Sequence, residues 1–444
     1  MHPSKRSRLD RRDFLGLGAL GAAGLAFGSL PRQASSFDDY RALVCVFLYG
    51  GIDSLNLLVP MESSAYATYA NTRGVLAEPF ESLLPVQSAS APSIPLGLHA
   101  QAGELASLFS AGRLAFLANV GPLVQPTTKA EILAGTAQLP KELGSHIDQQ
   151  RGWQRAWASS VTPTGWMGRM LDHMSIEAGA LPLPPSVAVD FADVTQVGAT
   201  GGPYVVGSNG PGVSSVLSDP LRALAIQELL GDSISPLHSA LAKTQSEAME
   251  IGSELAALLA TAPSFDGLFG DDPLARQLRM VARLIALRES IGLKRQAFFV
   301  SMGGWDTHED QFTQLPILIG TLSRAVGAFQ TALDQIQAAD QVVTVTQSEF
   351  ARTLTSNGEG SDHAWGGHAF AIGNPVLGGE LYGTLPDLSS TGPDVADIGS
   401  VIPRLAVEQY DATAARWFGL DPSALPAVFP NLHRFDSDDL GFLA

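Results

Sequence analysis

The stretch ALVCVFLYGGIDSLN (42–56) joins an unbroken apolar run to a Gly-Gly turn and an aspartate. Unbroken apolar runs of this length, ended by turn residues, are typical of strands that are buried on both faces, as in a parallel sheet. Three further runs have the same character, at 114–120, 297–302 and 342–346. The sequence therefore predicts a central, mostly parallel sheet.

Amphipathic helices are predicted between these strands. In 315–337 apolar residues recur every three or four positions, which indicates one face of a helix of about six turns. In 272–290 the apolar positions again lie on one side, and Pro273 after Asp272 is a typical helix start. Strands that alternate with helices predict an α/β fold in which helices sandwich the sheet.

Length and composition favour one domain with an insertion. The 444 residues are 45% hydrophobic and 16% charged, so a large core is available and global disorder is not expected. Residues 195–218 are rich in Gly, Ser and Pro, and a helical stretch follows them. We therefore expect a single domain over 35–444, with a helical and irregular insertion near 195–290.

Residues 1–34 have the features of a twin-arginine export signal. A basic start is followed by the pair Arg11-Arg12 and by a run rich in Gly, Ala and Leu. A membrane anchor is disfavoured because the run from Phe14 to Leu30 is shorter than the roughly 20 residues of a membrane span. The sequence thus predicts a periplasmic or secreted protein with no stable membrane anchor after signal cleavage.

Without residues 1–34 the chain is strongly acidic. That segment holds six of the 27 Lys and Arg and two of the 44 Asp and Glu, so 21 basic and 42 acidic side chains remain, a net charge of −21. Such a surface repels phosphate backbones, and nucleic-acid binding is not expected. Cys45 is the single cysteine and lies in an apolar run, so we expect a buried thiol and no internal disulfide.

Polar residues follow the predicted strands where each strand ends. GGIDSLN (50–56) supplies Asp53, and GGWDTHED (303–310) supplies Asp306 and His308. Ligands bind outside the carboxyl ends of parallel strands, and glycines let the backbone turn sharply and approach a ligand closely. We therefore expect these side chains to converge at one edge of the sheet.

The segment QSEFARTLTSNGEGSDHAWGGH (347–368) follows the last apolar run and adds Glu349, Arg352, His363 and His368. Imidazole nitrogens and carboxylate oxygens are ligands of zinc and manganese, and a site richer in oxygen suits calcium. Taken singly, each such residue is more often a solvated side chain than a ligand. Taken together, they predict a divalent metal site.

Ser145 is the candidate nucleophile. In LGSHIDQQRGWQ (143–154) it precedes a helical pattern, and the backbone N–H groups at a helix N-terminus favour an anion there. In the alternative interpretation Ser145 only caps the helix, with Asp148 completing the pair. The cap is the commoner use of a serine in this position.

Several motifs in combination resemble the secreted family known as domain of unknown function 1501. They extend over about residues 40–433 and include GGIDSLNLLVP, SHIDQQRGWQ, GGWDTHEDQ and SEFARTLTSNGEGSDHAWGGHAFAIG. The resemblance implies a fold like that of the alkaline phosphatase and sulfatase superfamily, which is an α/β sandwich with metal ligands at the strand ends.

The resemblance also implies roles for single residues. The implied metal ligands are Asp53, Asp306, His308, Glu349, His363 and His368. Ser145 would be the nucleophile. If the protein is a hydrolase, we expect Arg352 or Lys129 to hold the anionic group of the substrate. Three features depart from the pattern. Phe350 stands where the hydrolases place a metal-binding histidine, Asp53 comes after a Gly-Gly and later than usual, and Ser145 lacks a clear nucleophile motif.

Two functions are compatible with these features. The first is a metal-dependent hydrolase of phosphate or sulfate esters, with a small anionic ester as substrate and zinc, manganese or calcium as cofactor. The second is a non-catalytic secreted protein that keeps the fold for binding or assembly with a protein partner, and Phe350 favours it. A dinucleotide enzyme is disfavoured, since no Gly-x-Gly-x-x-Gly follows a strand.

Overall fold

The computed structural model describes most of the chain after the expected signal. The described residues are 37–90, 92–159, 161–211, 235–396 and 399–444, together with Arg222, Ala225, Glu228 and Gly231. The export signal expected at 1–34 lies outside them. In the part of the chain that is described, no helix is both long and apolar enough to cross a membrane.

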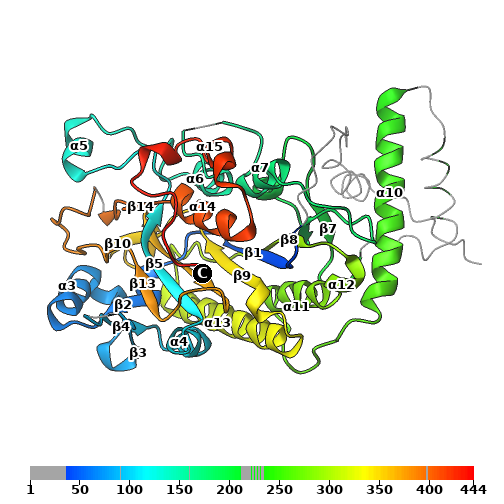
Figure 1. Ribbon diagram of the computed structural model, residues 1–444. Coiled ribbons are helices and arrows are strands. Elements are labelled where there is room, and N and C mark those ends of the chain that lie inside the picture. Colours follow the sequence, from blue (N-terminus) through cyan, green and yellow to red (C-terminus); the bar gives the residue numbers. More distant parts are fainter. Residues whose placement is uncertain are drawn as a thin grey trace, which may run out of the picture.

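A nine-stranded sheet forms the centre of the molecule (Figure 1). Its strands are β1 (Arg41–Leu48), β5 (Leu114–Gly121), β6 (Ser186–Val189), β7 (Tyr204–Val206), β8 (Arg295–Met302), β9 (Val342–Gln347), β12 (Gly367–Ile372), β13 (Glu380–Tyr382) and β14 (Leu405–Ala406). They follow the order β13-β5-β12-β9-β1-β8-β6-β7, and β14 pairs with β5. Every pair is parallel except those of β12, which runs antiparallel to β5 and β9.

The side chains of β1 alternate between two hydrophobic cores. Val44 and Val46 lie in the core on one face of the sheet, and Cys45 and Phe47 lie in the core on the other. Successive side chains of a strand point to opposite faces, so a strand covered on both sides needs a continuous apolar run. The four apolar runs are β1, β5, β8 and β9, and the prediction of a mostly parallel, doubly covered sheet is confirmed.

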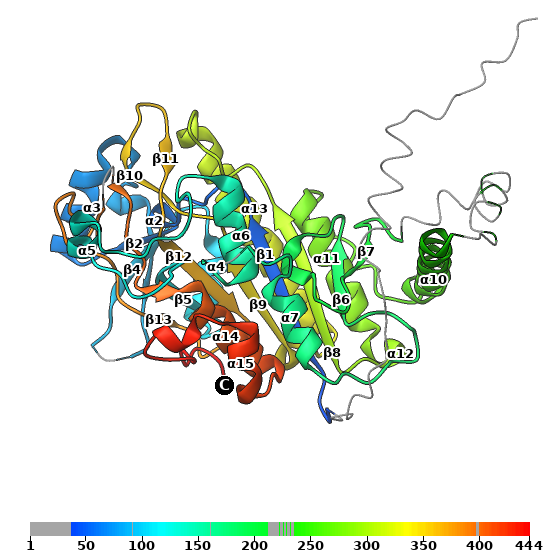
Figure 2. The same cartoon turned by 90° about the horizontal axis from the view of Figure 1, so that it is seen from above.

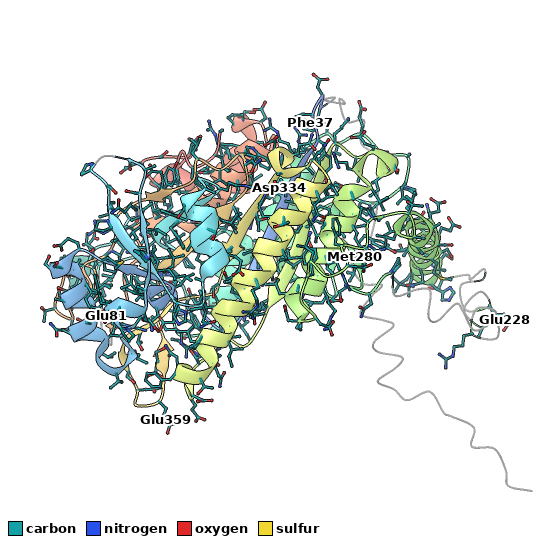
Figure 3. The ribbon with its side chains drawn as sticks, turned by 90° about the horizontal axis from the view of Figure 1, so that it is seen from below. Phe37, Glu81, Glu228, Met280, Asp334 and Glu359 are labelled. Atoms are coloured by element: carbon teal, nitrogen blue, oxygen red, sulfur yellow. The ribbon has the colours of Figure 1, made fainter. Side chains whose placement is uncertain are left out.

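One face of the sheet is covered by α4 (Gly103–Ser110), α11 (Pro273–Ala286) and α13 (Gln311–Gln335). Asp272 caps α11, so that this helix begins at the predicted residue. α13 begins before the predicted residue 315. In Figure 3 α13 extends from the neighbourhood of Glu359 to Asp334, along the sheet.

The opposite face is covered by α6 (His146–Arg155), α7 (Trp166–His173), α14 (Val407–Phe418) and α15 (Leu425–Val428). Figure 1 shows the two helix layers above and below the sheet. The α/β sandwich agrees with the fold predicted from the alternation of strands and helices.

The remaining elements lie around this sandwich. They are the strands β2 (Leu58–Pro60), β3 (Leu84–Gln87) and β4 (Pro95–Leu98), which form a small antiparallel sheet, the hairpin of β10 (Arg352–Ser356) and β11 (Ser361–His363), and the helices α2 (Ser54–Leu57), α3 (Ser63–Arg73), α5 (Lys129–Ala134), α10 (Pro236–Leu259) and α12 (Arg288–Ile291). Figure 2 shows α10 at the margin of the molecule, beyond β7.

The segment 195–290, expected as an insertion, contributes to the central layers. β7 pairs in parallel with β6, and α11 packs in the core beneath the sheet. The single-domain organisation stays a prediction.

Candidate metal centre

The carboxyl ends of β1, β8 and β9 meet at one edge of the sheet, because β1 pairs in parallel with both of its neighbours. The turns that follow these strands therefore leave from the same place. Figure 2 shows the β10–β11 hairpin beside the first turns of α13. The backbone N–H of Gln311 donates to the carbonyl of Glu359 at 3.2 Å, which joins the start of α13 to the tip of the hairpin.

The Gly-Gly turn after β1 allows the segments after β8 and β9 to lie directly against it. A Cβ atom on Gly50 would lie 2.3 Å from the backbone nitrogen of Asp306, and one on Gly51 would lie 2.3 Å from the ring of Phe350. Both glycines also have positive φ angles, 119° and 85°, which side-chain-bearing residues rarely adopt. The turn needs glycine because its backbone packs on the segments that form the site.

Asp306 lies at the centre of a cluster of imidazoles. Its Oδ1 is 3.1 Å from His308 Nε2 and 3.2 Å from His363 Nε2, and its Oδ2 is 3.4 Å from His146 Nε2. Arg352 Nη1 donates to Oδ1 at 2.9 Å. The side chain of Asp306 is 45% exposed, so the cluster is open to solvent.

His363 and His308 present the same ring nitrogen to Asp306. His363 Nδ1 lies 2.8 Å from the carbonyl oxygen of Gly144, and His308 Nδ1 lies 2.9 Å from Asp362 Oδ1. Because these oxygens only accept hydrogen bonds, the tautomer with the proton on Nδ1 satisfies them in both rings and leaves the Nε2 lone pair available to a cation. The two Nε2 atoms are 2.8 Å apart, so both nitrogens converge beside Asp306.

His146 joins the cluster from the first turn of α6. Its Nδ1 lies 3.0 Å from Glu349 Oε1, so Nε2 again points toward Asp306. One ligand atom each from His146, Asp306 and His363 lie within 4.8 Å of one another. Imidazole nitrogens combined with a carboxylate fit a divalent ion such as zinc or manganese better than calcium, which prefers oxygen ligands.

Burial and charge place two of these groups in the form that a cation requires. Burial opposes ionisation of Asp306, but the hydrogen bond and charge of Arg352 outweigh it, and the pKa of Asp306 is lowered. Burial lowers the pKa of His363 more than the hydrogen bond to Gly144 raises it. Asp306 is therefore a carboxylate and His363 a neutral imidazole at neutral pH.

Arg352 is a buried part of the framework. Its Nη1 donates to the carbonyl of Gly50 at 3.2 Å as well as to Asp306, Nη2 donates to the carbonyl of Ser361, and Nε donates to Ser361 Oγ at 3.5 Å. The side chain has no exposed surface. In this arrangement Arg352 orients Asp306, and its nitrogens are already engaged by protein oxygens.

Two predicted ligands belong to neighbouring networks. Asp53 is fully buried, pairs with Arg73 and accepts a hydrogen bond from Gln311 Nε2 at 2.6 Å. His368 is buried, and its Nδ1 accepts a hydrogen bond from the backbone N–H of Asn119 at 3.2 Å. Burial lowers the pKa of His368 to about 4. Neither residue belongs to the group of three that shares the 4.8 Å spacing.

Ser145 caps α6, in agreement with the alternative interpretation of its segment. Its Oγ accepts a hydrogen bond from the backbone N–H of Asp148 at 3.3 Å and donates to Asp148 Oδ2 at 2.9 Å. The cap fixes the first turn of α6 and with it His146, which was not among the ligands predicted from the sequence. The sequence signal that could have identified His146 as a site residue is its place as the first residue of a helix that a serine caps.

The ring of Phe350 packs against two of the imidazoles. Its ring stacks on His363 with centroids 4.5 Å apart and an interplanar angle of 28°, and it lies 5.0 Å from the ring of His146. The position at which the resemblance implied a histidine ligand therefore carries an aromatic packing surface.

The fold and this cluster define an α/β protein with a histidine–carboxylate site at the carboxyl edge of a mostly parallel sheet. The chain belongs to the family described as protein of unknown function (DUF1501), whose model matches residues 40–425. No curated protein matches the sequence.

Solved structures align with the chain at low similarity. The alignment with the crystal structure of Ps i-CgsB covers 89% of this chain and 77% of the Ps i-CgsB chain, with 9% identity and a TM-score of 0.34. A Bacteroides thetaiotaomicron protein, from work on the metabolism of multiple glycosaminoglycans, covers 87% of this chain and 74% of its own, with 10% identity and a TM-score of 0.36.

Proposed function

We propose that this protein binds a divalent metal ion at Asp306, His146, His308 and His363, and hydrolyses small phosphate or sulfate esters there. The orientation of the three imidazoles supports the proposal most directly. Each has Nδ1 at a protein oxygen and Nε2 at Asp306. Metal-binding histidines usually show this pattern, because the outer hydrogen bond fixes the tautomer and the ring orientation.

The residues of the cluster have separate roles in this proposal. A bound ion supplies Lewis acidity, which polarises an ester oxygen and lowers the pKa of water. Arg352 holds Asp306 in place, and Phe350 holds the ring of His363. Because Ser145 Oγ is engaged with Asp148, we propose that water is the attacking group. A bond forms from the water oxygen to phosphorus or sulfur while the bond from that atom to the ester oxygen breaks, and the alcohol departs with a proton that the water gives up.

The charges around the cluster favour esters that carry little negative charge. Glu309, Asp310 and Glu359 are exposed on the segments that bear the cluster, whereas Arg352 is buried. A negative field repels a dianionic ester more strongly than a monoanionic one. We therefore propose sulfate monoesters or phosphodiesters as substrates in preference to phosphate monoesters.

We further propose that the protein is exported by the twin-arginine route to the periplasm or beyond, as the pair Arg11-Arg12 before an apolar run suggests. The acidic net charge supports a protein that does not bind nucleic acid.

A second candidate function is metal binding without catalysis, in a secreted binding or assembly protein. The hydrogen bonds of Arg352 and Ser145 favour it, because both groups expected to act on an ester are occupied by protein atoms.

Metal analysis combined with ester assays tests both candidates. The full chain, purified after export, would be analysed for bound metal and assayed with p-nitrophenyl sulfate, p-nitrophenyl phosphate and bis-p-nitrophenyl phosphate. We expect stoichiometric zinc or manganese, and hydrolysis that a chelator abolishes and the metal restores. Bound metal without hydrolysis would favour the second candidate, and absence of metal would contradict both.

His363→Ala and His433→Ala form a matched pair for this test. Both imidazoles have Nδ1 2.8 Å from a backbone carbonyl, that of Gly144 for His363 and that of Pro430 for His433. Only His363 lies beside Asp306. We expect His363→Ala to lose metal and hydrolysis, and His433→Ala to retain both.

A further inference from the structure

Glu349 is a buried residue, and its hydrogen bonds are concentrated on one of the two carboxylate oxygens. It has no exposed surface, and its Oε1 receives three hydrogen bonds, from the backbone N–H of Gly50 at 2.8 Å, from His146 Nδ1 at 3.0 Å and from Gln150 Nε2 at 3.1 Å. These donors come from the turn after β1 and from α6. Glu349 therefore joins α6 to the sheet edge, and His146 is one of the groups that it holds.

The position of Glu349 relative to the His146 ring separates it from the metal cluster. Glu349 Oε1 lies at Nδ1 of this ring, and Asp306 Oδ2 lies at Nε2. Since the two nitrogens face away from each other across the imidazole, Glu349 and Asp306 lie on opposite sides of the ring. Glu349 is also outside the group of ligand atoms within 4.8 Å of one another.

We propose that Glu349, although expected from the sequence to be a ligand, is a positioning residue that holds His146 in the metal-binding tautomer. The inference rests on the proposed metal site. A carboxylate oxygen that accepts a hydrogen bond from Nδ1 favours the tautomer with the proton on that nitrogen and leaves the Nε2 lone pair available to a cation. Without Glu349, the His146 ring loses the hydrogen bond that orients it.

Asp362 provides an internal comparison, because it accepts the hydrogen bond of His308 Nδ1 in the same way. The side chain of Asp362 is 54% exposed, whereas that of Glu349 is fully buried. Water can replace an exposed acceptor but not a buried one. The structure therefore assigns to Glu349 a much larger effect on metal affinity than to Asp362, although each carboxylate accepts a hydrogen bond from the Nδ1 of a histidine.

Zinc affinity of the full chain tests this assignment. We expect Glu349→Gln to weaken zinc binding by roughly 10- to 100-fold, the usual cost of removing an outer carboxylate, and Asp362→Asn to weaken it by less than about 3-fold. Glu359→Gln, an exposed change at the tip of the same hairpin, serves as the control and should leave zinc affinity unchanged. An effect of Asp362→Asn equal to that of Glu349→Gln would overturn the assignment.

A double-mutant cycle separates positioning from direct ligation. If Glu349 acts through His146, then His146→Ala combined with Glu349→Gln should bind zinc no more weakly than His146→Ala alone. Additive losses would show that Glu349 contributes to the ion independently, and would overturn the proposal.

Nitrogen-15 NMR of histidine-labelled wild-type protein without metal gives a test that needs no variant. We expect the Nδ1–H tautomer for His146, and the Nε2–H tautomer would contradict the role of Glu349. If wild-type protein bound no zinc, the proposed function would fail, but this measurement would still decide whether Glu349 sets the tautomer of His146.

Discussion

Two turns of this protein share the pattern Gly-Gly-x-Asp, and their aspartates have opposite environments. Asp53, at the end of 50–53, is fully buried and pairs with Arg73. Asp306, at the end of 303–306, is 45% exposed and faces three imidazoles. The glycines allow the backbone to turn at the edge of the sheet in both places. The neighbouring elements determine whether the aspartate forms a buried ion pair or faces an exposed cluster of imidazoles.

The buried aspartate supports the exposed one through a short hydrogen-bonded chain. Gln311 donates to Asp53 at 2.6 Å and accepts from Ser361 Oγ at 2.5 Å, and Ser361 in turn accepts from Arg352, the residue that holds Asp306. Changes at Asp53 should therefore affect folding first, whereas changes at Asp306 should affect the ion first.

The largest expected effect on stability comes from Asp53→Asn. This change leaves the Arg73 guanidinium buried without a charge partner, which costs about 3–5 kcal/mol of unfolding free energy. Chemical denaturation measures the loss, and Glu309→Gln, at an exposed acid of the second turn, should change it by less than about 0.5 kcal/mol. Adding Arg73→Met to Asp53→Asn should recover part of the stability, and a lack of recovery would argue against an ion pair as the cause.

Asp306→Asn should weaken zinc binding strongly and lower the stability only a little, the reverse of what is expected for Asp53→Asn. Replacing the central carboxylate by a neutral amide should weaken zinc binding about 100-fold, or about 2.7 kcal/mol. The unfolding free energy should fall by less than in Asp53→Asn, since Asp306 lies partly in solvent. Isothermal titration with zinc and parallel denaturation measure both quantities. Equal zinc affinity in wild type and variant would remove Asp306 from the site.

The contrast between buried and exposed groups also applies to His368, which the sequence predicted as a ligand, and to the exposed His433. His368 is buried with a pKa of about 4, against 6.5 for an unperturbed imidazole. Below pH 6.5 the unfolded state binds more protons, so the stability present above that pH is lost as the pH falls toward 4. Between pH 6.5 and 5 this loss is about 2 kcal/mol.

His368→Asn should remove that part of the pH dependence, because the amide oxygen can still accept from Asn119 without titrating. Denaturation at several pH values checks this result. The exposed His433→Asn should follow the wild-type curve, and a steep curve that persists in His368→Asn would assign the dependence to other groups.

The smallest expected effect is that of a change at Gly303, which contrasts with the same change at Gly51. A Cβ on Gly303 would meet nothing within 4 Å, whereas a Cβ on Gly51 would meet the ring of Phe350 at 2.3 Å. Gly303→Ala should therefore change the unfolding free energy by less than about 1 kcal/mol, and Gly51→Ala should cost more than about 2 kcal/mol. Similar losses in both variants would mean that both turns pack tightly, contrary to the structure.

The strands and helices that were predictable from sequence are those with a strong local pattern. β1 and β8 are recognisable because a strand covered on both faces must be apolar at every position, and α11 because its apolar positions repeat every three or four residues. The reversed direction of β12 was not predictable, since a short apolar strand reads the same whichever way it runs.

The site was predictable only as a set of candidates. Sequence placed Asp306, His308 and His363 at one edge, but a local pattern cannot show that Arg73 reaches Asp53 from a different helix. His146 was missed because its partner Glu349 lies 203 positions away. Contacts between residues that are so far apart in the sequence depend on packing, and no local spacing of residues predicts them.

The antiparallel strand β12 has a consequence for how the protein can vary. β9 ends at the site edge and β12 begins there, so the connecting residues 348–366 leave and re-enter the sheet at the same side. This excursion carries Glu349, Arg352 and His363 without having to traverse the molecule. Its exposed tip at 357–359 can lengthen or shorten while the layered scaffold keeps its strand order, because Glu349 and Arg352 are buried and hold the site at the base of the excursion.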